Sequence, residues 1–187
     1  MVRETARARF FFFCLTFDQL VREGVEGDRA ELGAYKSRTA TLLAKMARKL
    51  GRTAYILDTF TGFDPADVVG IDASVNATDF RDTALEAVRA LVGEDNVRYV
   101  KGRFPQSAGQ LPSGGRYCLV HIDCDLHAPI LSALQYFYPR VVPGGFLIRR
   151  RTQQVDVSAG GKKLIVWKFT KQANRGVRSV RISHRAI

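Results

Sequence analysis

The chain has 187 residues, of which 46% are hydrophobic and 25% are charged, as is typical of one soluble globular domain. Its longest N-terminal apolar run, FFFFCLTF at residues 10–17, is too short to span a bilayer and lacks a small-residue cleavage site. We therefore expect neither a membrane protein nor a secreted one. The three cysteines lack metal-type spacing, which favours a cytoplasmic protein with Cys118 buried and reduced in a strand.

The net charge of +11 is unevenly distributed. Residues 149–187 contain 11 of the 29 basic residues and one of the 18 acidic residues, which gives this segment a charge of +10 and leaves +1 for residues 1–148. A nearly neutral core followed by a basic tail argues against a nucleic-acid-binding fold, and any such binding through the tail should be weak and independent of base sequence.

The N-terminal half of the sequence alternates between helical and extended patterns. A short helix is expected over residues 15–24, where the aromatic run packs, and a strand over 28–34. Apolar residues then recur at helical spacing over 42–50, and Gly51 stands where a C-terminal cap is expected. TAYILD at 53–58 predicts a second strand, and the Gly and Pro residues of TFTGFDPADVVG indicate that a loop follows it.

The same alternation continues in the C-terminal half. Residues 83–86 (Thr-Ala-Leu-Glu) match a capping box, so a helix is expected to begin there. Strands are predicted at 96–102 and 117–123. An apolar face over 130–138 predicts a helix, and VVPGG is expected to turn the chain into a fifth short strand at 145–148.

Strands that alternate with helices predict an α/β protein with a doubly wound, mostly parallel, Rossmann-like sheet. The apolar strand YCLVHI fits a sheet that is covered on both faces. Ligands bind such sheets beyond the carboxyl ends of the strands. That edge carries Glu31, Gly33, Asp58, Thr59, Gly102, Asp123 and Asp125.

Two of these motifs are ambiguous when each is taken alone. In AELGAYKS, Gly33 before a helix would let a ligand approach the backbone, but an ordinary strand-to-helix turn explains the pattern equally. Asp58 stands near the offset at which an acidic residue receives ribose hydroxyls, and a turn-forming aspartate is the alternative.

In HIDCDLH, two carboxylates at i and i+2 suit a hard cation or a cation with a general base. The alternative for Asp125 is a helix cap. His121 is interpreted as a core histidine, and His127 as a solvated residue of the first helical turn.

Jointly, AELGAYKSRTATLLA, YILDTFTGFD, VRYVKGRFPQS and VHIDCDLHAPILSALQYFYPRVVPGGF resemble the macrocin O-methyltransferase family over roughly residues 15–148. That resemblance implies a class I fold and an S-adenosylmethionine-dependent transfer to a hydroxyl of a sugar or glycosylated small molecule. It implies roles for seven residues: Glu31, Gly33, Tyr35, Asp58 and Thr59 at the cofactor, Asp123 as a magnesium ligand, and Asp125 as the base that deprotonates the hydroxyl. A divalent cation there would lower the pKa of the attacking hydroxyl.

The sequence departs from the family pattern at several of these sites. Ser37 and Arg38 replace glycines, and His127 replaces a tyrosine. Two aspartates that complete the metal site in the family correspond to Arg149 and Arg150, which cannot ligate magnesium, so the site is incomplete and the metal is in question.

Residues 1–148 are thus interpreted as the cofactor-binding core and 149–187 as a basic tail. Two interpretations of the tail stay open: a reading frame displaced near residue 148, since some arginine codons read one base later encode aspartate, or a genuine segment that completes the sheet. Two alternatives to the methyltransferase also stay open, a cofactor-binding relative without turnover and a nucleic-acid-binding module that uses the tail. A monomer and a homo-oligomer are both compatible with the sequence.

Overall fold

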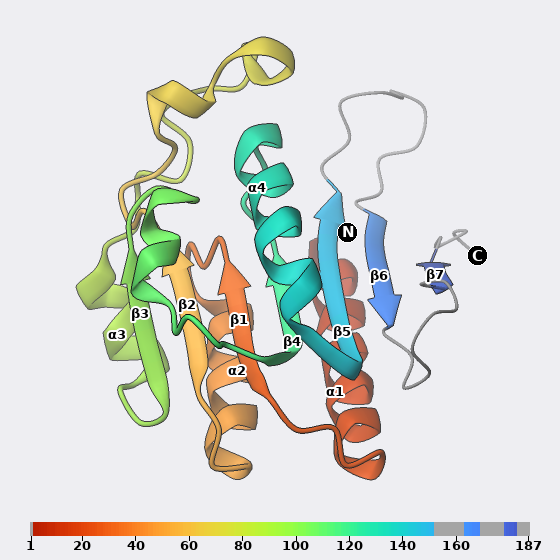
Figure 1. Ribbon diagram of the computed structural model, residues 1–187. Coiled ribbons are helices and arrows are strands. Elements are labelled where there is room, and N and C mark those ends of the chain that lie inside the picture. The colour runs from red at the N-terminus through yellow and green to blue at the C-terminus, as the bar shows by residue number, and fades with distance from the viewer. Residues whose placement is uncertain (1, 152–162, 169–177, 183–187) are drawn as a thin grey trace.

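A computed structural model describes residues 2–151, 163–168 and 178–182, and the side chains of residues 7–149. Within these ranges the strands form one sheet in the order β3-β2-β1-β4-β5-β6-β7 (Figure 1). The strands are β1 (Asp28–Leu32), β2 (Ala54–Asp58), β3 (Val97–Lys101), β4 (Tyr117–Ile122), β5 (Val141–Arg151), β6 (Lys163–Lys168) and β7 (Arg178–Ile182). Strands β1 to β5 pair in parallel, and β6 and β7 are added in antiparallel pairs. The predicted mostly parallel α/β sheet is confirmed.

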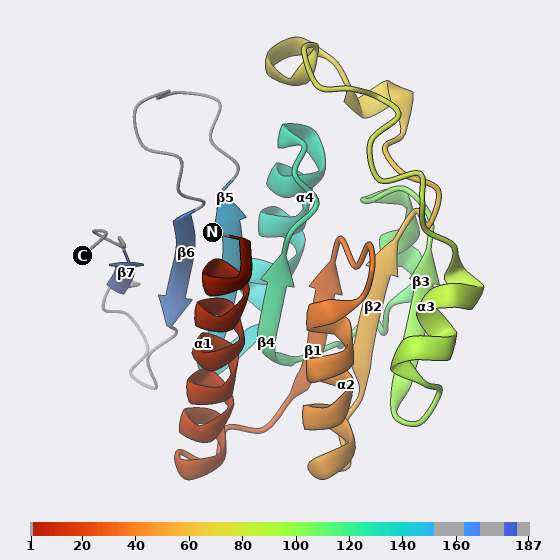
Figure 2. The ribbon, with the colours of Figure 1, turned by 180° about the vertical axis from the view of Figure 1, so that it is seen from behind.

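Helices cover both faces of this sheet. The α-helices are α1 (Val2–Arg22), α2 (Arg38–Lys49), α3 (Leu85–Val92) and α4 (His127–Phe137). Figure 2 shows α1, α2 and α3 in front of one face, while α4 lies on the other. Alternate side chains of the strands therefore enter two apolar layers, and β4 is buried along its whole length. Cys118 of β4 is buried and free, as expected.

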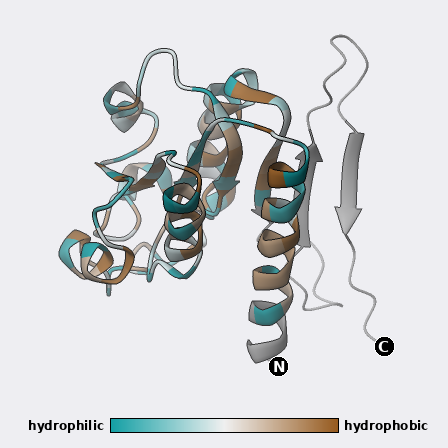
Figure 3. Cartoon of the chain, turned by 90° about the horizontal axis from the view of Figure 1, so that it is seen from below, coloured by the Kyte–Doolittle hydropathy of each residue, from teal (hydrophilic) through white to brown (hydrophobic). Residues whose placement is uncertain are grey.

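Helix α1 is much longer than the helix predicted over residues 15–24, because it begins at Val2. The aromatic run does pack within it: Phe13 is buried against the sheet, while Phe10 and Phe11 are exposed. Figure 3 shows that α1 carries apolar and polar residues mixed along its length. None of the helices in the described ranges combines the length and apolar character that a membrane crossing requires.

Strand β5 also differs from its prediction, because VVPGG lies inside the strand and not in a turn before it. The register against β4 shifts between Tyr117, which pairs with Val141, and Leu119, which pairs with Phe146. This irregularity absorbs the Pro-Gly-Gly residues without ending the strand.

The arginines continue β5. Arg149 pairs with Ile122 on one side and with Ile165 of β6 on the other. Strands β6 and β7 extend the sheet from there. The rest of the basic tail, residues 152–162, 169–177 and 183–187, lies outside the described residues, and the displaced reading frame stays a prediction.

Candidate active site at the carboxyl edge of the sheet

A cavity of about 470 Å³ lies at the carboxyl edge of the sheet. The loops after β1, β2, β3 and β4 all contribute to its wall. The wall includes every residue for which the sequence predicted a role: Glu31, Gly33, Tyr35, Asp58, Thr59, Asp123 and Asp125. The rule that ligands bind beyond the carboxyl ends of parallel strands therefore predicted that these residues lie together, although it does not assign their roles.

Gly33 is required by the neighbouring strand. Its φ is +95°, and a Cβ at this position would lie 2.4 Å from the carbonyl oxygen of Asp123 and 2.8 Å from the amide nitrogen of Cys124. The Asp123 amide donates to the Leu32 carbonyl at 2.8 Å, which holds the ends of β1 and β4 together. The close approach thus involves protein backbone, which fits the strand-to-helix turn that the sequence offered as the alternative to a ligand contact.

Asp58 joins two loops of the cavity wall. One carboxylate oxygen accepts hydrogen bonds from the backbone N–H groups of Ala34 at 2.7 Å and Tyr35 at 3.0 Å. The other accepts from the N–H of Phe60 at 2.8 Å and from the Thr59 hydroxyl at 3.4 Å. The loop after β1 and the loop after β2 are therefore fixed to one carboxylate. Ribose hydroxyls would have to share these oxygens or displace their donors.

Glu31 is bonded to His121 beneath the cavity. The Glu31 Oε1 and His121 Nδ1 atoms are 2.8 Å apart, and the edge of the Phe13 ring contacts the imidazole. Both polar side chains are buried, which confirms the expectation of a core histidine at 121. Burial raises the pKa of Glu31, and the bond to His121 opposes this in part. The second oxygen, Oε2, is buried and has no hydrogen-bond partner among the described residues.

The raised pKa of Glu31 gives stability a defined pH dependence. A group whose pKa is raised on folding stabilises the fold below its unfolded value, here 4.5, and that contribution is lost as pH rises through the folded value. Glu31→Gln is therefore expected to flatten the decline in unfolding free energy above pH 4.5. Urea denaturation at a series of pH values measures it, with exposed Glu86→Gln of α3 as control. Equal pH slopes for wild type and Glu31→Gln would contradict the assignment.

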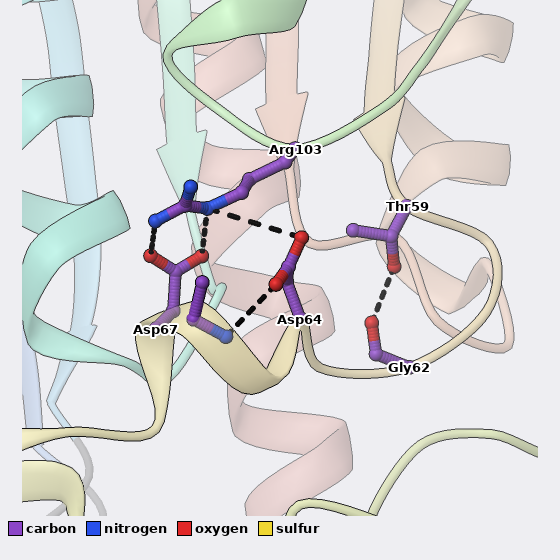
Figure 4. A network of polar contacts seen from close by, with 6 residues as sticks. Thr59, Gly62, Asp64, Asp67 and Arg103 are labelled. Carbon is purple, nitrogen blue, oxygen red and sulfur yellow. Dashed lines mark hydrogen bonds and ion pairs between the residues drawn. The ribbon is translucent and has the colours of Figure 1, made fainter.

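An ion pair between Arg103 and Asp67, here called the clamp, holds the segment that follows β2 (Figure 4). The Arg103 guanidinium, on the loop after β3, donates to both carboxylate oxygens of Asp67, at 2.9 and 2.5 Å. Asp64 lies 4.0 Å from the same guanidinium and accepts from the Ala66 N–H to begin the short helix η1 (Pro65–Asp67). The hydrogen bonds to Asp67 raise the pKa of Arg103. These residues line the cavity but were not predicted, since no local motif indicates a pair so distant in sequence.

Tyr35 is held by the segment before α3. Its ring packs edge-on against Phe80, and its hydroxyl donates to Asp82 at 2.8 Å. The Thr83 hydroxyl donates to the Tyr35 carbonyl at 3.0 Å. The predicted capping box is therefore wrong: Ala84 is the N-cap of α3 and no side chain caps the helix. A tertiary hydrogen bond has taken the hydroxyl that the local motif would use.

Thr83→Val should cost about 1 kcal/mol of stability, because it removes one hydrogen bond and keeps the shape of the side chain. Thr83→Ser retains the hydroxyl and is the matched control. Equilibrium denaturation should place the serine variant within about 0.5 kcal/mol of the wild type. If valine were tolerated as well as serine, the bond to Tyr35 would contribute nothing to stability.

Asp123 and Asp125 follow β4 but have different surroundings. Asp125 has a φ of 61° and does not cap α4, whose N-cap is Leu126. The Asp72 carboxylate instead accepts the first backbone N–H of α4, from His127, whose side chain is exposed as expected. The Asp123 carboxylate forms an ion pair with Arg9 of α1, at 3.7 Å.

These residues do not fit the magnesium ion that the resemblance implies. Among the residues described, no group of three or more His, Cys, Asp or Glu side chains is suited to hold a metal. The guanidinium of Arg9 lies beside Asp123, and Arg149 stands where the family pattern has an aspartate. A cation placed on Asp123 would be repelled by Arg9.

Comparison with known proteins identifies the chain's relatives. Residues 4–170 match the family model described as macrocin O-methyltransferase, TylF. The chain belongs to the macrocin O-methyltransferase family. The family match is wider on both sides than residues 15–148, so it does not stop at the arginines of β5.

Two curated proteins are similar to this member of the family. One is 8-demethyl-8-(2,3-dimethoxy-alpha-L-rhamnosyl)-tetracenomycin-C 4'-O-methyltransferase of Streptomyces olivaceus, 28% identical over 144 residues, which are 70% of this chain and 55% of the relative. The other is mycinamicin III 3''-O-methyltransferase of Micromonospora griseorubida, 28% identical over 147 residues, 70% of this chain and 57% of the relative. The chain thus matches little more than half the length of each.

Solved structures confirm the class I methyltransferase fold. The O-methyltransferase NovP superposes with a TM-score of 0.70 at 18% identity, over 87% of this chain and 80% of NovP. A calicheamicin methyltransferase, CalS11, superposes with a TM-score of 0.52 at 21% identity, over 75% of this chain and 64% of the CalS11 chain.

Proposed function

We propose that this chain binds S-adenosylmethionine in the cavity and transfers its methyl group to a sugar hydroxyl of a glycosylated small molecule. The observation that carries the proposal is the convergence of the seven predicted residues on one cavity of about 470 Å³, in a member of a methyltransferase family. That volume is within the range of about 300–1,000 Å³ that small-molecule sites occupy.

The residues after β1 and β2 form the cofactor side of the cavity. Glu31 has a buried oxygen without a partner among the described residues, and an N–H donor of the ligand would satisfy it. Gly33 and Tyr35 supply the backbone of the loop that Asp58 holds, and Thr59 begins the facing loop. The carboxylates of Asp58 and Asp125 favour a positively charged ligand at this edge.

Asp125 is the general base of the proposal. S-adenosylmethionine supplies an electrophilic methyl on a sulfonium, which leaves as a neutral thioether. As the sugar oxygen bonds to the methyl carbon, the hydroxyl proton passes to the Asp125 carboxylate. Asp123 and Asp125 lie on the same loop after β4, and both line the cavity. An acceptor bound there would therefore contact both carboxylates on the same side of the cavity.

Glycosylated acceptors are supported by the relatives. The two curated proteins are named for methyl transfer to tetracenomycin and mycinamicin substrates, the first of which carries a rhamnosyl group. A rhamnosyl-tetracenomycin and mycinamicin III are therefore the acceptors to assay first.

Calorimetry with S-adenosylhomocysteine tests the cofactor site, and transfer of a labelled methyl group to those acceptors tests the reaction. We expect saturable binding and labelled product. A folded protein that gives neither heat nor a thermal shift with millimolar S-adenosylhomocysteine would refute the proposal. Binding without transfer to any glycoside would instead support a cofactor-binding relative without turnover.

A further inference from the structure

Helix α1 brings a positive charge to the wall of the cavity. It runs antiparallel to the parallel strands, so its N-terminal end lies at their carboxyl edge, beside β4 and β5 (Figure 2). Arg9, near that end, lines the cavity, and its Nη1 atom is 3.7 Å from Oδ2 of Asp123. The Arg9 side chain is 29% exposed and that of Asp123 is 10% exposed, so the pair is partly withdrawn from water but still borders the cavity.

The position of this pair matters because Asp123 is the residue to which the family resemblance assigns the metal. A guanidinium is charged at all physiological pH values and cannot ligate a cation. It neutralises the carboxylate that would attract the metal and repels any cation that approaches. The end of β5 adds a second guanidinium where the family pattern has an acidic ligand: Arg149 pairs in register with Ile122, immediately before Asp123.

A guanidinium can do part of what the metal would do for an acceptor. Its N–H groups form a planar fork that donates two parallel hydrogen bonds to two neighbouring oxygen atoms. Vicinal hydroxyls of a sugar present two such oxygens. The guanidinium can therefore orient a diol and stabilise negative charge as the attacking oxygen loses its proton, while Asp123 fixes the guanidinium itself.

We propose that Arg9, anchored by Asp123, takes the place of the divalent cation, so that this chain binds vicinal sugar hydroxyls and transfers methyl groups without a metal. The inference rests on the acceptor site proposed above. In this scheme Arg9 contacts the acceptor oxygens, Asp123 is the positioning residue that holds Arg9, and Asp125 receives the proton. No metal-bound step is needed.

The first experiment measures metal binding by the full-length chain with S-adenosylhomocysteine bound, using the electron paramagnetic resonance signal of free Mn²⁺. Mn²⁺ prefers the same oxygen ligands as Mg²⁺. Wild type and Arg7→Gln, which changes an exposed arginine of the same helix, are expected to bind no Mn²⁺ at the cavity. The double variant Arg9→Gln with Arg149→Asp, which removes the Arg9 guanidinium and restores a carboxylate at the end of β5, is expected to gain a Mn²⁺ site, and the further change Asp123→Asn is expected to abolish it.

Two outcomes of this experiment would overturn the inference. One is a saturable Mn²⁺ site in the wild type that Asp123→Asn removes, because the guanidinium would then not keep the cation out. The other is Mn²⁺ binding by the double variant Arg9→Gln with Arg149→Asp that is no stronger than that of Arg149→Asp alone, because Arg9 would then not be what excludes the cation. Calorimetry with S-adenosylhomocysteine on the same samples tests the proposed function independently. If S-adenosylhomocysteine did not bind, the proposed cofactor site would be refuted, while the Mn²⁺ measurement would still report on the metal site.

The second experiment measures turnover with a glycoside acceptor whose sugar carries two free vicinal hydroxyls. Transfer by the wild type should be the same in EDTA and in Mg²⁺. Arg9→Gln should lower kcat/KM for the acceptor roughly 10- to 100-fold, through a lower kcat as well as a higher KM, which is the loss expected for charge-assisted hydrogen bonds that orient the acceptor and stabilise the developing charge. Arg7→Gln should leave it unchanged. A wild-type activity that EDTA abolishes and Mg²⁺ restores would refute the inference.

Discussion

Gly33→Ala is expected to lower the free energy of unfolding by about 3–5 kcal/mol, a large share of the roughly 5–15 kcal/mol of a typical domain. The added Cβ would lie 2.4 Å from the carbonyl oxygen of Asp123, a backbone atom that cannot move without separating the ends of β1 and β4. An alanine would also be strained at a φ of +95°. Thermal and urea denaturation measure the loss.

The matched control for Gly33→Ala is Gly51→Ala. Gly51 follows α2 with a φ of +61°, and a Cβ there would meet no atom within 4 Å. It therefore reports the backbone strain alone, about 1 kcal/mol. If both alanine variants lost the same free energy, the contact with Asp123 would carry no weight. If Gly33→Ala remained folded and bound S-adenosylhomocysteine normally, the close packing of β1 against β4 would not be needed for the cavity.

The strands and the binding edge could be predicted from the sequence because they depend on local pattern. Short apolar runs bounded by turn residues indicated β1 to β4, and the parallel topology then placed Asp58 and Asp123 at the same edge. The start of α1 could not be predicted in this way, since RETARAR has no apolar periodicity to mark it. VVPGG carries strong turn signals, and its place within β5 depends on pairing with β4, which begins at Val141.

The features that were missed depend on contacts between residues far apart in the chain. Thr83 is followed by a glutamate at the spacing of a capping box, but its hydroxyl bonds to Tyr35. The clamp between Arg103 and Asp67 and the ion pair between Arg9 and Asp123 join residues from different elements. Propensity and spacing carry no information on such pairs, whereas the fold brings each of them to the cavity wall.

Asp58→Asn is expected to cost about 2–4 kcal/mol of stability and to weaken S-adenosylhomocysteine binding at least about 10-fold. The carboxylate accepts from the N–H groups of Ala34, Tyr35 and Phe60, and hydrogen bonds to an ionised acceptor are the stronger kind. An asparagine keeps the shape of the side chain. Its NH₂ group, however, would face some of these backbone N–H groups, and two donors cannot form a hydrogen bond with each other. The loop after β1 would then lose its attachment to the loop after β2.

Asp28→Asn is the matched control, because Asp28 also accepts a backbone N–H, from Thr53 at 2.9 Å, but at the opposite end of the strands from the cavity. It should cost about 1 kcal/mol and leave ligand binding unchanged. Calorimetry with S-adenosylhomocysteine and its 2′-deoxy analogue separates two roles of Asp58. If Asp58 acts through the loops, removing the ribose hydroxyl costs the same affinity in wild type and Asp58→Asn, within about 0.5 kcal/mol.

The loop role is the expected one, because both oxygens of the Asp58 carboxylate already accept from the protein. A ribose held directly by Asp58 would give a different result: the hydroxyl would matter in the wild type and not in the variant. Such coupling would contradict the loop role. It would also mean that the ribose hydroxyls either share the carboxylate oxygens with the N–H groups of Ala34 and Tyr35 or displace these donors when the cofactor binds.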